Sequence, residues 1–376
     1  MASLRPQGRA RGEVLLSFFN QPFLLRRGQP VPITHQHHWE SLLMGRMFLE
    51  LGYAVDVIHY ANQAFVPRKP YAIVVDARRN MERFAAALPG STKIMHIDTA
   101  HILFHNAAEA ARLLALQQRR GVTLRPRRWE MPTLAIEAAD CATIYGNAQT
   151  MATYAYAGKP LYPVPTISPL TYPWPEEKSY EAARRRYLFL SSGGMVHKGL
   201  DLVLEAFAAM PEYHLTVCAP VGAEGDFERA YRRELYESPN IQTLGWVDVG
   251  SDDFVALTSR CVGLIYPSCS EGQAGAVVTC MHAGLIPVMS AASGVTPSDF
   301  GVLLPTCTVQ GIRETVAALS ALPAGELQAR SRLAWEAARR EHTREAFARA
   351  FRAALLVITG EPAPTEEPAL RVALRV

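Results

Sequence analysis

A repeated alternation of short apolar runs with amphipathic stretches constrains the fold of this chain most strongly. Apolar runs that no regular polar alternation interrupts are typical of strands buried on both faces of a parallel sheet. In the first half of the chain, strands are predicted over 14–19, 54–60, 71–77, 92–97 and 141–146, with helices over 39–52 and 107–121. The helix over 107–121 ends at Gly121, a common helix terminator.

The alternation stops at a proline-rich segment and then restarts. Residues 159–178 contain Pro160, Pro163, Pro165, Pro169, Pro173 and Pro175. Such a segment cannot form a helix or a central strand, so it predicts a connection between two domains. Beyond it, strands are predicted over 186–192, 213–220, 241–246, 262–268 and 285–290, and one or two helices over 324–356.

A chain of 376 residues exceeds the roughly 250–300 residues at which a single core stops growing. We therefore predict an α/β fold with two doubly wound, Rossmann-like domains that face a central cleft. The predicted segments are a disordered tail (1–12), an N-terminal domain (13–165), a linker (166–182), a C-terminal domain (183–340), a helix packing back on the N-terminal domain (341–358) and a tail (359–376).

The composition argues against three classes of protein. A net charge of +3 is too small for general nucleic-acid binding, so no nucleic-acid partner is predicted. No apolar run reaches the ~18 residues of a membrane-spanning helix, and Asn20 cuts the run 14–19 short of a signal-peptide core. The six cysteines form no C-x-x-C pair, which is typical of reduced thiols in a cytoplasmic protein.

The first motif of chemical interest is SSGGMVHKGL, which follows the strand predicted over 186–192. Ligands of open parallel sheets bind outside the carboxyl ends of the strands, where Gly193 and Gly194 lie. Glycines allow a ligand to approach the backbone closely. Lys198, at the start of the next helix, opposes the helix dipole unless an anion is bound there. The alternative is a simple chain reversal with Lys198 in water.

The second motif follows the strand over 262–268. Glu271 and Gly272 come just before a helix predicted from about Ala276 to Gly284. Backbone N–H groups at a helix start can hold a diphosphate, and Glu271 stands where it could contact a polar ligand group. The alternative is that Glu271 is only a helix-capping carboxylate.

Together, the two motifs resemble the donor half of the GT-B glycosyltransferases, in particular the group 1 (GT4-like) family. The likeness covers most of the chain, and its segments occur in the order and spacing of the family. These segments are the strand–glycine–lysine turn, LGWV (244–247), PS-x-x-EG (267–272), A-G-x-P-V (283–288), and in the first half 39–60 and 136–165.

The resemblance implies roles for individual residues towards a nucleotide-sugar donor. They are Gly193 and Gly194 (beneath the donor), Lys198 (diphosphate), Trp246 and Val247 (base pocket), Glu271 (donor sugar), and Gly272, Gln273, Ala274 and Gly275 (phosphates). Two positions depart from the family pattern. Gly193 stands about where an arginine is usual, and Thr279 stands where a glutamate commonly holds the ribose. These departures leave open an inactive relative.

Histidines gather at two predicted strand ends of the first half. They are His35, His37 and His38 in THQHHWE, and His96, His101 and His105 around Asp98 in MHIDTAHILFHN. A histidine could take the proton of an acceptor hydroxyl, the cluster could bind zinc or copper, or the side chains could be ordinary loop and core residues. No H-E-x-x-H or D-x-D spacing supports a metal. We predict that His101 and Asp98 act on the acceptor.

A basic stretch, 117–130, carries Arg119, Arg120, Arg125, Arg127 and Arg128 beside Trp129. It predicts either peripheral contact with the inner membrane face or an acidic glycan, or a solvated loop.

The sequence thus predicts a metal-independent glycosyltransferase of the hexosyltransferase type, involved in polysaccharide biosynthesis. It would transfer a sugar from a nucleotide-diphosphate sugar to a hydroxyl of a glycan or lipid-linked glycan, without any other cofactor. The resemblance implies retention of the anomeric configuration. Two alternatives remain, a non-catalytic nucleotide-sugar or glycan binding protein and a nucleotide-sugar epimerase of the same fold.

Overall fold

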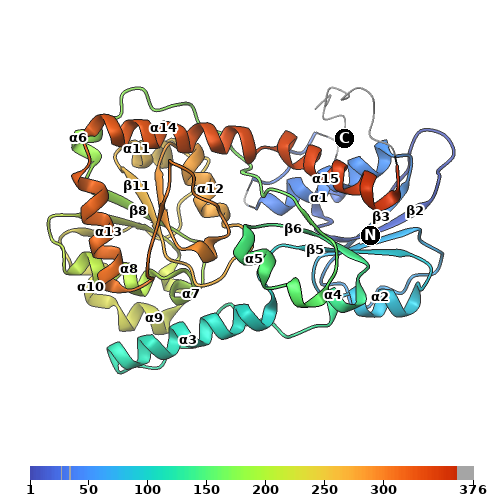
Figure 1. Cartoon of the computed structure of the whole chain (residues 1–376), viewed down its shortest axis with the longest axis horizontal. Helices are drawn as coiled ribbons and strands as arrows, with labels where there is room; N and C mark the ends of the chain where they lie inside the picture. The colour runs from blue at the N-terminus through green and yellow to red at the C-terminus, as the bar shows by residue number, and fades with distance from the viewer. Residues whose placement is uncertain (27, 34, 362–376) are drawn as a thin grey trace.

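The computed structural model describes residues 1–26, 28–33 and 35–361. It contains two α/β domains, each built on one sheet, with the proline-rich linker and the last long helices crossing between them (Figure 1). The fold class is as predicted. Most of the tail predicted over 359–376 lies outside the described residues.

The N-terminal domain has a seven-stranded sheet in the order β1-β3-β2-β4-β5-β6-β7. The strands are β1 (Ala2–Leu4), β2 (Glu13–Phe18), β3 (Ala54–His59), β4 (Ile73–Asp76), β5 (Thr92–Ile97), β6 (Cys141–Ile144) and β7 (Leu161–Pro163). All neighbours pair in parallel except β1 and β3. β7 lies at the edge of the sheet, where a strand tolerates proline.

The prediction of a disordered tail over 1–12 is wrong for β1. Ala2, Ser3 and Leu4 pair antiparallel with β3, and the Ser3 hydroxyl donates a 2.7 Å hydrogen bond to Asp56. A strand this short has no periodic pattern that would distinguish it from a loop.

The C-terminal domain has a fully parallel six-stranded sheet in the order β10-β9-β8-β11-β12-β13. The strands are β8 (Arg186–Leu190), β9 (His214–Cys218), β10 (Ile241–Thr243), β11 (Gly263–Tyr266), β12 (Ile286–Met289) and β13 (Val302–Leu303). The two residues of β13 were not predicted. β8 and β11 lie in the middle of the sheet, so the loops after them open at its centre, where ligands of such sheets bind.

Helices cover the sheets on both faces. Their bounds are α1 (Gln36–Glu50), α2 (Met81–Ala87), α3 (Ile102–Arg120), α4 (Ala135–Ala138), α5 (Ala148–Ala152), α6 (Tyr180–Ala183), α7 (Met195–Lys198), α8 (Leu200–Ala208), α9 (Gly225–Ala230), α10 (Arg232–Tyr236), α11 (Asp252–Ser259), α12 (Gly275–His282), α13 (Val309–Ala321), α14 (Ala324–Glu341) and α15 (Arg344–Thr359). Short 3-10 turns are η1 (Gln21–Leu24), η2 (Ala155–Ala157), η3 (Val221–Ala223) and η4 (Ala291–Ser293). No helix of the described ranges combines the length and the apolar character that crossing a bilayer requires.

Helix α15 returns the chain to the N-terminal domain. Phe347 and Phe351 are fully buried in the core of that domain, and Phe351 packs edge-on against Phe48 of α1 at 6.1 Å between ring centroids. The stretch 324–356, predicted as one or two helices, forms two: α14, on the C-terminal domain, and α15, on the N-terminal domain (Figure 1).

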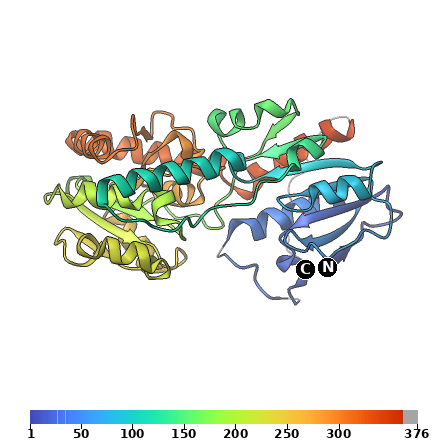
Figure 2. The ribbon, with the colours of Figure 1, turned by 90° about the horizontal axis from the view of Figure 1, so that it is seen from below.

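Helix α3 leaves the N-terminal domain and runs across the C-terminal domain (Figures 1 and 2). Leu116 of α3 is part of the C-terminal core. Three of the five arginines in the basic stretch pair with acidic residues of the C-terminal domain: Arg119 with Asp201 and Glu205, Arg120 with Glu234, and Arg127 with Asp226. This stretch thus connects the domains, which neither interpretation from sequence anticipated.

Candidate active site

A cleft of about 560 Å³ lies between the two domains. Its N-terminal wall is formed after β2 and β5 and at the start of α1, and its C-terminal wall is formed after β8 and β11. These are carboxyl ends of parallel strands, the edge at which α/β sheets bind ligands.

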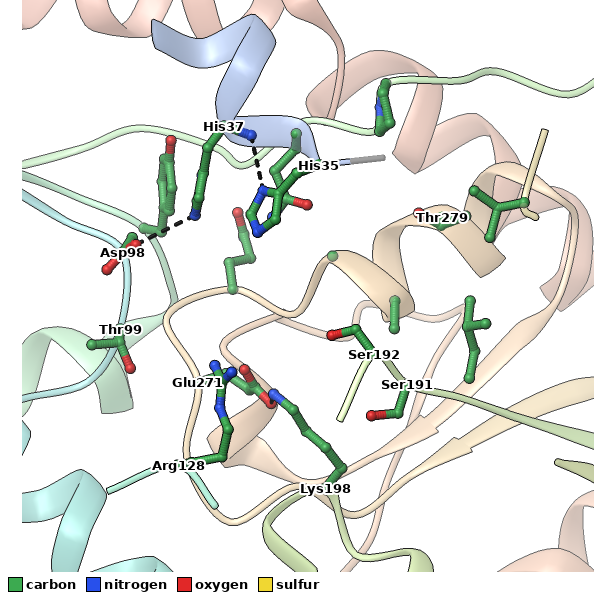
Figure 3. Close-up of a pocket in the computed structure, with 18 of the residues that line it drawn as sticks. His35, His37, Asp98, Thr99, Arg128, Ser191, Ser192, Lys198, Glu271 and Thr279 are labelled. Carbon is green, nitrogen blue, oxygen red and sulfur yellow. Dashed lines mark hydrogen bonds and ion pairs between the residues drawn. The ribbon is translucent and has the colours of Figure 1, made fainter. Parts of the chain in front are cut away.

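Lys198 and Glu271 meet on the C-terminal wall (Figure 3). Lys198 ends α7, Glu271 lies between β11 and α12, and their side chains form an ion pair. The Glu271 carboxylate also accepts hydrogen bonds from the hydroxyls of Tyr266 (3.1 Å) and Ser268 (2.7 Å). Burial acts to raise the pKa of Glu271, but the charges of Lys198, His197 and Arg128 together outweigh it and hold that pKa at about 2. The Glu271 carboxylate is therefore ionised at neutral pH.

Gly193 and Gly194 do not line the cleft, although both were predicted to lie beneath a donor. Ser191 and Ser192, which follow β8 directly, line it instead. The buried carboxylate of Glu224 accepts hydrogen bonds from the backbone N–H groups of Gly194 (2.5 Å) and Met195 (3.1 Å). These two N–H groups at the start of α7 are therefore already bonded within the protein.

The other donor-side residues divide into two groups. Those that line the cleft are Trp246, Val247, Gln273, Gly275 and Thr279. Gly272 and Ala274 do not line it, because Ala274 is buried and Gly272 is pressed against the N-terminal domain. A Cβ at Gly272 would come within 2.4 Å of the Asp98 carbonyl oxygen.

The N-terminal wall carries a buried charge network centred on Asp98. Asp98 Oδ2 is 3.3 Å from His37 Nε2 and 2.7 Å from Arg78 Nη2, and His37 Nδ1 is 2.5 Å from Glu40. Burial acts against a charge on His37, but Glu40 and Asp98 raise its pKa to about 9. Burial likewise opposes ionisation of Asp98, but Arg78 and His37 hold the pKa of its carboxyl well below the usual range.

One carboxylate oxygen of Asp98 accepts no hydrogen bond from the described residues of this network. Asp98 Oδ1 is buried and has no hydrogen-bond partner among the described residues. A buried, ionised carboxylate oxygen without a donor is energetically costly.

The structure places His101 outside the cleft and so corrects the predicted pairing with Asp98. The Nδ1 atom of His101 caps α3 by accepting a 3.3 Å hydrogen bond from Leu103 N–H, and Nε2 is 2.9 Å from the Tyr156 hydroxyl. His37 contacts Asp98 instead. The sequence analysis also missed Arg78, although it lies two residues after the end of β4, close to a strand end like Asp98. Among the described residues, no group of three or more His, Cys, Asp or Glu side chains is arranged to hold a metal ion.

Comparison with known proteins bears on the family and on the fold. The family model for glycosyl transferases group 1 matches residues 184–321, which span β8 to α13. Those residues form a group 1 glycosyltransferase domain. The match includes both Lys198 and Glu271, and it confirms the resemblance on which the donor-side roles were predicted. No curated protein matches the chain by sequence.

Solved structures show that the whole chain has the GT-B fold. The chain is similar to sucrose-phosphate synthase from Thermosynechococcus elongatus, with a TM-score of 0.64 and 14% identity over 93% of this chain and 99% of that one. It is also similar to HepE from Anabaena in complex with UDP-glucose, with a TM-score of 0.59 and 13% identity over 92% and 100% of the two chains. The group 1 domain and the GT-B fold support nucleotide-sugar glycosyl transfer as the activity.

Proposed function

We propose that the protein transfers a hexosyl group from a nucleoside-diphosphate sugar to a hydroxyl of a glycan or lipid-linked glycan, with retention of configuration. The observation that carries this proposal is the Lys198–Glu271 ion pair on the C-terminal wall of the interdomain cleft. A lysine held in this way supplies positive charge to a leaving diphosphate, and this charge is the basis for proposing a reaction without a metal or a further cofactor.

The donor lies, in this proposal, along the C-terminal wall. Trp246 and Val247 contact the base, Thr279 contacts the ribose, and Lys198 contacts the diphosphate. Glu271 contacts hydroxyls of the transferred sugar. The contacts of Glu271 with Tyr266 and Ser268 support this role, because they fix the carboxylate in one orientation.

The acceptor hydroxyl is oriented by Asp98 on the opposite wall. A carboxylate that Arg78 and His37 keep ionised accepts a hydrogen bond from a hydroxyl, but it is a weak base. We therefore assign Asp98 to acceptor orientation, and His37 and Arg78 to positioning Asp98. His101 has no part in this assignment.

The test is donor turnover on a panel of uridine, guanosine, adenosine and thymidine diphosphate sugars, beginning with UDP-glucose because HepE binds it. Release of the nucleoside diphosphate is measured for wild type, Lys198→Gln and Lys159→Gln. Glutamine at 198 can still donate a hydrogen bond to Glu271 but carries no charge, whereas Lys159 lies outside the cleft lining. We expect Lys198→Gln to lose at least about a hundredfold in turnover and Lys159→Gln to match wild type.

Other outcomes identify the alternatives. If wild type binds a nucleotide sugar but neither wild type nor Lys198→Gln turns it over, the protein is a binding protein. If the sugar is epimerised while its diphosphate bond stays intact, it is an epimerase. If no nucleotide sugar binds, the proposed function is wrong.

A further inference from the structure

The loop that follows α3 belongs to the C-terminal domain in its contacts, although it precedes the interdomain linker in the sequence. Leu124 is buried in the C-terminal core. Asp226 of α9 accepts a 3.0 Å hydrogen bond from Arg125 N–H and pairs with the Arg127 guanidinium. Glu109 of α3 accepts hydrogen bonds from the N–H groups of Arg127 and Arg128, both at 2.9 Å. The backbone around residue 128 is therefore fixed relative to α7.

This loop holds Arg128 directly above the turn that leads into α7. Gly194 has φ of +74°, and a Cβ there would come within 2.7 Å of Arg128 Cγ. A glycine at this position thus leaves room for the arginine stem. Arg128 lines the cleft, and its guanidinium lies beside the side chains of Lys198 and Glu271 (Figure 3).

The Arg128 guanidinium has no acceptor of its own. Within the described residues, its hydrogen bonds are made by the backbone, and the side chain makes neither a hydrogen bond nor an ion pair. Its neighbour Arg127 is paired with Asp226, and Lys198 is paired with Glu271. Beside the C-terminal wall of the cleft, Arg128 therefore carries a positive charge, and no carboxylate of the described residues contacts and neutralises it.

The charge of Arg128 acts on both members of the Lys198–Glu271 pair. Burial lowers the pKa of Lys198, and the charge of Arg128 lowers it further. Burial raises the pKa of Glu271, and Arg128 acts with Lys198 and His197 to lower it. An anion placed between Arg128 and Lys198 would relieve the repulsion between the two cations.

Two backbone N–H groups at the start of α7 are not free for the same anion. Glu224 already accepts hydrogen bonds from Gly194 and Met195, and its carboxylate adds negative charge behind the turn. A diphosphate that approaches this turn must be neutralised by side chains, and Arg128 is the side chain that covers it.

We infer that Arg128, from the loop after α3, binds the diphosphate of the donor together with Lys198. This inference rests on the proposed function. The planar guanidinium can bind two phosphate oxygens at once, whereas an ammonium group acts as a point charge. Because Arg127, Glu109 and Leu124 fix the loop before any ligand arrives, little ordering is required on binding. The diphosphate site is thus built from segments on both sides of the interdomain linker.

The experiment is calorimetric titration with nucleoside diphosphates and with the matching nucleosides, on wild type, Arg128→Met, Arg128→Lys and Arg125→Met. Methionine retains an apolar stem over Gly194 and removes the charge. Arg125 is the matched control, because it lies in the same loop but outside the cleft lining. The probe is whichever of UDP, GDP, ADP and TDP binds wild type most tightly.

We expect Arg128→Met to weaken diphosphate binding by at least about tenfold and to leave nucleoside binding unchanged. Arg128→Lys should recover part of the affinity, and Arg125→Met should match wild type. The unliganded melting temperature should stay the same in Arg128→Met, because the guanidinium makes no hydrogen bond or ion pair within the part of the chain that the structure describes. If Arg128→Met binds the diphosphate as tightly as Arg125→Met does, the inference is overturned while the proposed function stands. If no diphosphate binds wild type, the proposed function fails and the inference falls with it.

Discussion

The carboxylate of Glu224 accepts a 2.5 Å hydrogen bond from the backbone N–H of Gly194. It accepts a second from Met195 N–H at 3.1 Å. An internal carboxylate therefore occupies the start of α7, where an external anion could otherwise bind. The same turn is tied to Lys198, whose backbone N–H donates to the Gly194 carbonyl oxygen at 2.8 Å.

Replacing Glu224 by alanine should destabilise the protein by about 1–3 kcal/mol, because two buried N–H groups lose their acceptor. The measurement is the urea midpoint at unchanged slope. Glu228→Ala is the control, since its carboxylate accepts a bond from Tyr236 at the surface and should cost no more than about 0.5 kcal/mol. Equal midpoints for the two variants would show that α7 does not depend on Glu224.

The Lys198–Glu271 pair should give the protein an acid-sensitive component of stability. The pKa of Glu271 falls from 4.5 to about 2, so its contribution is complete above pH about 4.5 and is lost as the pH falls towards 2. We expect the stability of Glu271→Gln to change less than that of wild type over this range. The test compares urea unfolding of both proteins from pH 6 to the lowest pH at which they fold. Parallel curves would mean that the carboxylate is not held by the lysine.

The sequence predicted strands well where both faces of the strand are buried. A strand was predicted over 262–268 and β11 is Gly263–Tyr266, because a strand inside a covered parallel sheet is apolar along its length. β1, β7 and β13 were missed because their few residues show no periodicity. The register with β3 holds β1 in place, and a partner strand far away in the sequence leaves no local signal.

The site was predictable only to the level of which loops reach the cleft. Lys198, Glu271 and Asp98 follow strand ends, and the topology of parallel sheets brings such ends together. Which histidine faces Asp98 depends on side-chain direction, so His101 was chosen where His37 makes the contact. Arg128 could not be found in this way, since its position depends on how α3 crosses the other domain.

The N-terminal wall of the cleft gives a prediction that distinguishes Asp98 from His101. Asp98→Asn should reduce turnover by about a hundredfold, because the charged acceptor for a substrate hydroxyl is lost. His101→Ala should stay within about twofold of wild type, since His101 lies outside the cleft and contacts Tyr156. Steady-state turnover at saturating donor is the measurement. A large loss of turnover in His101→Ala, with none in Asp98→Asn, would assign the role towards the acceptor to His101 instead.

The contact between Gly272 and Asp98 predicts opposite effects for the same substitution at two glycines. A Cβ at Gly272 would lie 2.4 Å from the Asp98 carbonyl oxygen and 2.9 Å from Thr99 N. Both atoms belong to the backbone and cannot rotate away, so Gly272→Ala should cost about 1–3 kcal/mol. Gly325 lies in the first turn of α14 with no atom within 4 Å of a built Cβ. Gly325→Ala should therefore be neutral or stabilising by up to about 1 kcal/mol. Urea unfolding of the two variants measures both effects, and a Gly272→Ala protein as stable as wild type would show that the domains do not touch here in solution.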